Sequence, residues 1–136
     1  MGDRRPLPVL YEDELPFWEG ARRGQLLLPH CPDCGCYWWP PGPVCPYCLS
    51  ERVEWSRASG RGRVISWVVF HKQYFEAFPT PYSVVWVELE EGPRLTGNLV
   101  GCEPDRIRSG MPVEAVFEKI TDEVTLVKFR PVGQNP

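Results

Sequence analysis

The sequence predicts a mainly β protein in three parts: an N-terminal helical segment, a compact ribbon built around four cysteines, and a C-terminal five-stranded barrel. One observation behind this prediction is a set of two Cys-x-x-Cys pairs, Cys31 with Cys34 and Cys45 with Cys48. A second is the Ser59-Gly60-Arg61-Gly62 stretch, after which apolar and polar residues alternate with period two. The predicted parts are 1–29 for the helical segment and the strand leading into the ribbon, 30–58 for the ribbon, and 59–136 for the barrel.

The N-terminal segment has the pattern of a short helical region. Aromatic and apolar residues between Tyr11 and Ala21 recur at helical spacing. Pro16 is tolerated in the first turn of a helix, and Gly24 is suited to cap its C-terminal end. We expect a turn or short helix over 11–15, a helix over 16–23, and a short strand over 25–29.

Each Cys-x-x-Cys pair predicts a knuckle, which is a tight turn that directs two thiolates at one point. Ten residues, from Gly35 to Val44, separate the two knuckles. This gap is shorter than the roughly 15–20 residues of common ribbons, but a short hairpin can close over it. Four thiolates at one point form the tetrahedral sulfur site that structural zinc prefers. We therefore predict a structural zinc ion, with no open coordination position, bound by Cys31, Cys34, Cys45 and Cys48.

Other interpretations of the cysteines are weaker. A redox Cys-x-x-Cys site would require a βαβ context, and a disulfide-rich secreted protein would require a signal peptide, and the sequence shows neither. Cys36 is a fifth thiol whose spacing suits neither knuckle, Cys102 is expected to be a plain thiol, and His30 is expected to be a strand residue. Because no apolar run reaches the roughly 20 residues needed to span a bilayer, we expect no membrane association and a cytoplasmic location.

The second half of the chain predicts a closed barrel. Alternation is clearest where Val85, Val87 and Leu89 face one way, and Gly97 marks a bulge or a close approach. The expected strands are 63–71, 82–91, 94–100, 112–119 and 123–130, with one helical turn between the third and the fourth. Closure removes the exposed edges of a small sheet. Five strands with this connection predict the oligonucleotide/oligosaccharide-binding (OB) fold.

The charge distribution argues against a nucleic-acid-binding function. The formal net charge is −3. Residues 1–60 carry 6 Lys/Arg and 8 Asp/Glu, and residues 61–136 carry 9 and 10. Since binding to nucleic acids depends mainly on positive charge, and neither half of the chain is basic, we expect no nucleic-acid partner.

The ordered motifs of the chain resemble those of the DUF35 proteins, which join a rubredoxin-like zinc ribbon to an OB barrel. The resemblance covers nearly the whole chain. Its main motifs are Pro16-Phe17-Trp18-Glu19-Gly20, Cys31-Pro32-Asp33-Cys34-Gly35, Cys45-Pro46-Tyr47-Cys48, Gly60-Arg61-Gly62-Arg63-Val64, Val87-Glu88-Leu89-Glu90-Glu91-Gly92 and Gly110-Met111-Pro112-Val113. One departure is Leu49, at a position where a knuckle often ends in glycine.

The resemblance implies a non-catalytic accessory or scaffold subunit of a thiolase-like enzyme that acts on acyl-CoA. The partner would be of the thiolase or steroid side-chain aldolase type, and a MaoC-type hydratase is a further candidate partner. The sequence fits this role because it has only two histidines, His30 and His71, and no Gly-x-Ser-x-Gly elbow. The alternatives are a stand-alone module that binds CoA or acyl-CoA and a nucleic-acid-binding zinc-ribbon/OB protein.

Aromatic side chains exceed what so small a protein is expected to bury. An exposed group of rings marks an interaction site, although Phe75 and Phe78 could instead plug the barrel end. The candidate contacts with a partner or with acyl-CoA are these rings and nearby cations: Trp38, Trp39, Arg61, Arg63, Lys72, Tyr74, Phe75, Phe78 and Tyr82.

Overall fold

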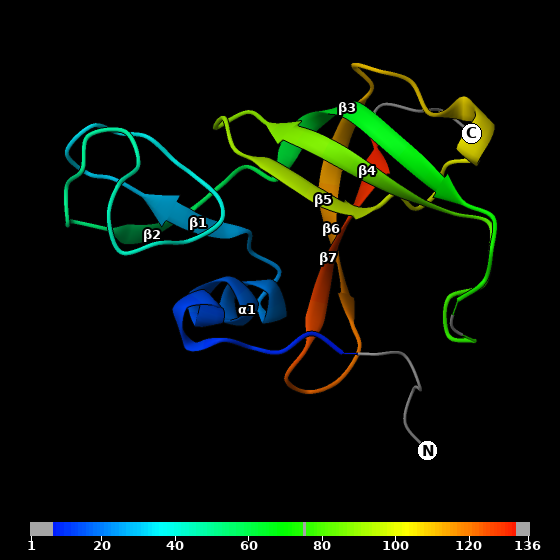
Figure 1. Ribbon diagram of the computed structural model, residues 1–136, viewed down its shortest axis with the longest axis horizontal. Helices are drawn as coiled ribbons and strands as arrows, with labels where there is room; N and C mark the ends of the chain where they lie inside the picture. Colours follow the sequence, from blue (N-terminus) through cyan, green and yellow to red (C-terminus); the bar gives the residue numbers. More distant parts are fainter. Residues whose placement is uncertain (1–6, 75, 133–136) are drawn as a thin grey trace.

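The computed structural model describes residues 7–74 and 76–132 (Figure 1). A helix, a two-stranded ribbon and a five-stranded barrel follow one another along the chain, which agrees with the predicted fold class. Phe75, one of the candidate contacts, lies outside the described residues. Within the described part of the chain, no helix is both long and apolar enough to cross a bilayer.

The N-terminal helical segment divides as its sequence predicts. A 3₁₀ turn, η1 (Glu12–Glu14), leads into helix α1 (Leu15–Arg22). Pro16 lies in the first turn of α1, where a missing N–H costs no intrahelical hydrogen bond. Gly24 ends the helix with φ of 73°, and its N–H donates to Ala21 O at 3.0 Å. This left-handed residue is the cap that the sequence indicates.

Strands β1 (Leu27–His30) and β2 (Glu54–Arg57) pair antiparallel and frame the cysteine ribbon. β1 starts two residues later than the predicted strand over 25–29. β2 is a strand that the pattern does not predict, because its four residues show no apolar alternation. Pairing with β1 is therefore a tertiary effect, in which the two knuckles bring the ends of the ribbon together.

The barrel strands are β3 (Arg61–Phe70), β4 (Tyr82–Leu89), β5 (Arg94–Asn98), β6 (Pro112–Lys119) and β7 (Thr125–Pro131). Their order in the sheet is β5-β4-β3-β6-β7. A parallel bridge between Leu99 and Phe129 links the two outer strands, and Val100 N–H donates to Phe129 O at 2.8 Å. A 3₁₀ turn, η2 (Pro104–Arg106), lies between the third and fourth barrel strands. These features confirm the predicted OB barrel.

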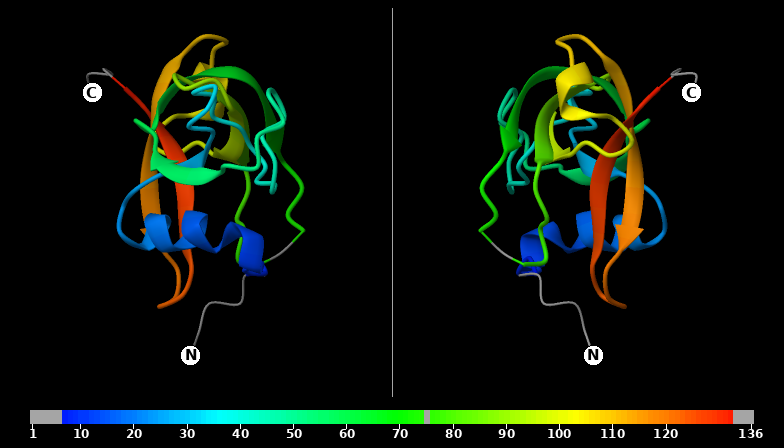
Figure 2. Two further views of the ribbon diagram at one scale, coloured as in Figure 1. Left: turned by 90° about the vertical axis from the view of Figure 1, so that its left-hand side faces the viewer. Right: turned by 90° about the vertical axis from the view of Figure 1, so that its right-hand side faces the viewer.

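One hydrophobic core joins the barrel to the ribbon and the helix. Val85 and Val87 of β4 are fully buried and Leu89 nearly so, as the alternation predicts. The same cluster includes Phe17 of α1 and Leu28 of β1. The ribbon and the helix are therefore packed onto the barrel rather than tethered to it, and Figure 2 shows α1 lying across β6 and β7 near one end of the barrel.

Gly97 lies at a close approach of β5 to β7, as its place inside a strand indicates. A Cβ atom there would lie 3.2 Å from ring carbons of Phe129 and 3.2 Å from the carbonyl oxygen of Val127. Because Phe129 is fully buried, its ring has little room to move. Glycine at this position allows β5 and β7 to approach each other and close the barrel.

Candidate metal centre and contact surfaces

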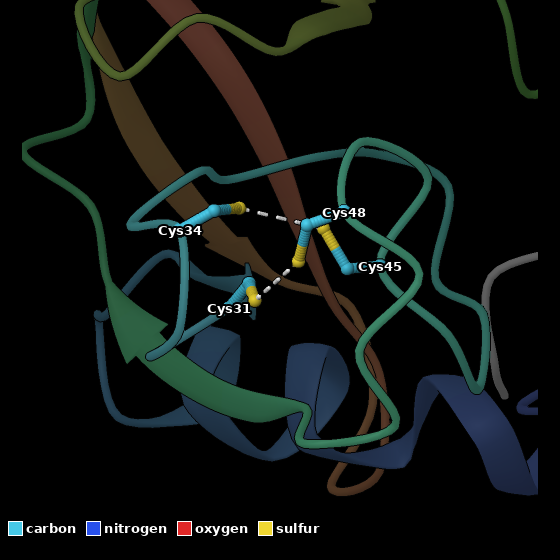
Figure 3. Close-up of side chains that lie close together, drawn as sticks. All are labelled: Cys31, Cys34, Cys45 and Cys48. Carbon is cyan, nitrogen blue, oxygen red and sulfur yellow. Dashed lines mark hydrogen bonds between the residues drawn. The ribbon is translucent and has the colours of Figure 1, made fainter.

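The two knuckles share one backbone geometry. In the first, Gly35 N–H donates to Cys31 O at 2.7 Å, and in the second, Leu49 N–H donates to Cys45 O at 3.0 Å. Gly35 and Leu49 both have positive φ, 79° and 65°. Each turn thereby directs its pair of cysteine side chains toward the other pair, as Figure 3 shows.

The four sulfurs fit one zinc ion. All four ligand atoms lie within 4.8 Å of one another. The Sγ atoms of Cys31 and Cys48 are 3.5 Å apart, and those of Cys34 and Cys45 are 3.6 Å apart. A tetrahedral zinc with Zn–S bonds of about 2.3 Å separates its sulfurs by about 3.8 Å. The cluster therefore has the size and the donor set of the structural zinc site that the cysteine spacing predicts.

The thiols of the cluster do not ionise equally. Burial raises the pKa of Cys45, but donors that include the Cys48 and Tyr47 N–H groups lower it more, so that it is about 7. The Cys36 N–H lowers the pKa of Cys34, whereas burial and three neighbouring thiols raise it far above its usual value. A bound zinc ion supplies the positive charge that stabilises four thiolates together. Falling pH opposes zinc binding, because protons compete for the same sulfurs.

A polar bridge connects the loop of the first knuckle to the segment after the second. Arg52 Nη1 donates to Asp33 Oδ1 at 2.7 Å, and the Ser50 hydroxyl donates to the other oxygen of Asp33. The Arg52 and Asp33 side chains are 71% and 39% exposed, so their ion pair adds little stability on its own. These contacts join the two loops on either side of the sulfurs.

The remaining thiols and His30 stand apart from the metal site. Among the described residues, the group that could hold a metal ion includes neither Cys36 nor Cys102. His30 Nδ1 lies 3.0 Å from Glu54 Oε1, and its ring centroid is 4.5 Å from that of Tyr37. His30 is thus the strand residue that the sequence predicts, at the last position of β1.

Leu49 carries backbone strain in the second knuckle, because a left-handed conformation costs a residue with a side chain roughly 1–2 kcal/mol. Its side chain is 74% exposed, so removing it loses little packing. We expect Leu49→Gly to raise the free energy of unfolding of the zinc-loaded protein by roughly 0.5–1 kcal/mol, part of the relief being offset by chain entropy. Denaturant unfolding would measure this change. Leu49→Ala is the matched control, since it keeps the strain, and a less stable Leu49→Gly would contradict the prediction.

The structure places the two candidate tryptophans of the ribbon in different surroundings. Trp38 is 5% exposed and packs with the buried Cys31 and Cys45. Trp39 is half-buried, and its ring centroid is 4.8 Å from that of Phe17 in α1. Trp38 therefore covers the sulfur cluster and offers little area to a partner, whereas Trp39 joins the ribbon to the helix and keeps part of its ring accessible.

Three further aromatic candidates, Tyr74, Phe78 and Tyr82, lie in the loop between β3 and β4 or at the start of β4. Tyr74 is 62% exposed, and Lys72 Nζ lies 5.2 Å from its ring centroid. Tyr82 stacks on Phe70 with centroids 4.9 Å apart, and the Phe78 centroid is 6.2 Å from that of Tyr82. Tyr74 is thus presented to solvent, while Phe78 and Tyr82 are half-buried.

The candidate arginines Arg61 and Arg63 both face carboxylates. Arg61 Nε lies 3.3 Å from Glu90 Oε1, and Arg63 donates to Glu88 Oε1 at 2.8 Å. Hydrogen bonding and charge from Arg63, with a smaller effect of Arg94, hold the pKa of Glu88 below its usual value. These cations are thus arranged in ion pairs along the strands rather than gathered as a phosphate site.

An apolar surface around Trp86 and Val68, two residues that are not among the candidate contacts, lies on the outer side of the barrel. Trp86 is 49% exposed and Val68 is 55% exposed, on the sheet side opposite the buried Val85 and Val87. A groove of about 790 Å³ continues from Trp86 to the ribbon, where the candidates Trp38 and Trp39 lie in the other wall together with Tyr47. We call Trp86, Val68 and this groove the outer face. The sequence feature that could have indicated this surface is Trp86, a tryptophan at a solvent-facing position of an alternating strand.

Comparison with known proteins finds one family model for the ribbon and another for the barrel. A family model described as "ChsH2, rubredoxin-like zinc ribbon domain" matches residues 18–54, and one described as "ChsH2, C-terminal OB-fold domain" matches residues 55–118. A chain of the solved structure "Ltp2-ChsH2(DUF35) aldolase" is 41% identical with a TM-score of 0.85, and the match covers 92% of this chain and 98% of that one.

Proteins with two kinds of name are similar to this chain in sequence. A "DUF35 domain-containing scaffold protein" of Methanocaldococcus jannaschii is 37% identical, with 79% of this chain and 82% of that protein covered. A "Probable enoyl-CoA hydratase alpha subunit" of Thermomonospora curvata is 42% identical, with 93% of this chain covered. The present chain spans only 40% of the length of that hydratase subunit. These matches confirm the resemblance drawn from the motifs, and the rubredoxin-like ribbon with its four cysteines confirms the structural zinc.

Proposed function

Because the chain belongs to the DUF35 family of zinc-ribbon and OB-fold proteins, we propose that it is a non-catalytic accessory subunit of an enzyme acting on acyl-CoA. The partner we infer is a thiolase-like aldolase, with a hydratase of the MaoC type as a further component. The observation that carries the proposal is the match to the DUF35 chain of an aldolase structure over 98% of that chain.

The chemistry of the described residues favours an accessory role over a catalytic one. Four protein ligands saturate a tetrahedral zinc ion, so the metal has no position for substrate or water. His30 is engaged with Glu54 at 3.0 Å and packs on Tyr37. Relatives named as scaffold proteins and as hydratase alpha subunits are consistent with a chain that works within an assembly.

We assign the contact with the partner to the outer face. Large exposed rings at the centre of an interface desolvate fully and carry much of its binding energy. Trp86 is a large exposed ring of this kind, because it is 49% exposed on the side of the sheet that faces away from the core. Arg94 of the same groove lies 3.4 Å from Glu88 Oε2, so this ion pair forms a polar rim, which suits a partner surface with an apolar centre and a polar margin.

We expect the isolated protein to turn over no acyl-CoA thioester and to raise the activity of a purified thiolase-like aldolase subunit from the same organism. Trp86→Ala should weaken the complex by about 2 kcal/mol while leaving zinc content and thermal melting unchanged. Tyr11→Ala is the matched control, because Tyr11 is 60% exposed and lies before η1, away from the outer face. Calorimetric titration with the partner would measure the affinities of both variants.

Two outcomes would count against these assignments separately. Turnover by the isolated protein would show that it is an enzyme. An unchanged affinity in Trp86→Ala would place the contact elsewhere, with Tyr74 as the next candidate from the sequence, and it would leave the accessory role standing.

A further inference from the structure

A second cavity, of about 740 Å³, has a lining that shares no residue with the groove of the outer face. Segments far apart in the sequence form it: the N-terminal stretch and α1, the loop between β3 and β4, the ends of β4 and β5, and β7. This volume is within the range of roughly 300–1,000 Å³ that is usual for small-molecule sites. Ligands of OB folds commonly meet the second and third barrel strands and the adjoining loops, which are the elements found here.

Most of the lining of this cavity is apolar. Trp18 of α1, Phe78 of the β3–β4 loop and Tyr82 of β4 contribute rings, and Leu99 and Leu126 contribute aliphatic surface. Trp18, Phe78 and Tyr82 are half-buried and Leu99 is buried, so part of each ring remains accessible in an apolar lining. Such walls favour a ligand with an apolar body.

The polar side chains of the lining are few. The Asn98 amide donates to the backbone carbonyl of Ser83 at 3.2 Å, which fixes the Asn98 side chain where β4 begins and β5 ends. Lys128 of β7 is the charged residue of the lining, and its side chain is only 15% exposed. Its ammonium group lies 2.6 Å from Glu118 Oε2. Since an ammonium group has three donors, one carboxylate oxygen does not saturate it.

We propose that this cavity binds the acyl part of a thioester, with the apolar body against Trp18 and Phe78 and the carbonyl oxygen toward Lys128. A single partly buried cation, with the Asn98 amide on the neighbouring strand end, suits one acceptor oxygen. It does not suit the several phosphates of the CoA moiety, which would lie outside the cavity. The choice of a thioester rests on the proposed function, whereas the apolar body and the oxygen acceptor rest on the cavity alone.

Binding can be tested on the full, zinc-loaded chain without any partner enzyme. The probe is cis-parinaric acid, a fluorescent fatty acid whose carboxylate stands in for the thioester carbonyl. We expect saturable one-to-one binding, displacement by decanoyl-CoA, and no displacement by CoA at the same concentration. Phe78→Ala and Lys128→Met should each weaken probe binding about tenfold. The matched controls Tyr74→Ala, in the same loop, and Lys119→Met, on β6, lie outside the lining and should change nothing.

Cys102 provides a readout in the unaltered protein. It lines the cavity, and burial raises the pKa of its thiol, so we expect slow alkylation by iodoacetamide. Decanoyl-CoA should slow this reaction further by several fold, as mass spectrometry of the digested protein would show. Cys36 is the internal control, because it lies in the ribbon and outside this lining. Equal protection of both thiols would overturn the proposal.

The outcomes separate this proposal from the proposed function. Absence of saturable probe binding, equal displacement by CoA, or full binding in both Phe78→Ala and Lys128→Met would overturn the acyl site and leave partner docking untouched. Probe binding that depends on the two cavity residues, in a chain that fails to bind the aldolase, would retain the site and reject the accessory role.

Discussion

Cys45→Ser is expected to abolish zinc binding and to unfold the ribbon while much of the barrel stays folded. The ribbon has only a small core of its own, in which Cys31, Trp38 and Cys45 are buried and Val53 packs beside them. Structural zinc contributes about 10–16 kcal/mol in units of this kind, far more than such a core can supply. Metal analysis would show the loss of zinc. Hydrogen exchange would show lost protection at Leu49, whose N–H bonds to Cys45 O.

The matched control for this change is Cys36→Ser. Cys36 is a thiol of the same ribbon that lies outside the four-sulfur group among the described residues. The Cys36→Ser variant should keep one equivalent of zinc and normal protection of the Leu49 N–H from hydrogen exchange. Zinc retained by Cys45→Ser, or lost from Cys36→Ser, would mean that the ligand set is wrong. Amides of β4 should stay protected in both variants, because β4 belongs to the barrel core.

Phe129→Ala is expected to destabilise the protein by about 3–5 kcal/mol, the usual cost of deleting a buried phenylalanine ring. Phe129 is fully buried and fills the space left by Gly97 where β5 meets β7. Its loss leaves a cavity that the closed barrel cannot collapse to fill. Urea unfolding would measure the change in free energy, and hydrogen exchange at Val100, whose N–H donates to Phe129 O, would report on closure.

Phe117→Ala is the matched control for the closure of the barrel. Phe117 lies on the neighbouring strand β6, pairs with Val127 and is only half-buried. Its truncation removes less buried surface and should cost less. A Phe129 variant that is no less stable than the Phe117 variant would show that the contact between β5 and β7 does not hold the barrel closed.

The outer face and the acyl cavity assign different tasks to different residues of one small barrel. The outer face carries exposed rings over a sheet, which is a surface for another protein. The cavity gathers half-buried rings around one cation, which is a space for a small molecule. Of the aromatic candidates in the described sequence, Tyr74 is left to solvent and Phe78 and Tyr82 line the cavity.

The sequence by itself determined the features that depend on local pattern. Two Cys-x-x-Cys turns specify the metal site because a knuckle is a local structure, and even Leu49 adopts the left-handed turn that the spacing requires. Alternation along β4 specifies its buried face because successive side chains of a strand point to opposite sides. Gly97 indicates a close approach because a strand rarely tolerates glycine without one.

Only the tertiary structure decided which rings are buried and which surfaces meet. Trp38 and Trp39 are neighbours with the same chemistry, yet one covers the sulfurs and the other packs on α1. β2 becomes a strand because the folded ribbon lays it against β1, a cause that no local pattern carries. The acyl cavity likewise needs α1, β4 and β7 together. Burial is a property of distant segments brought into contact, so spacing along the chain cannot specify it.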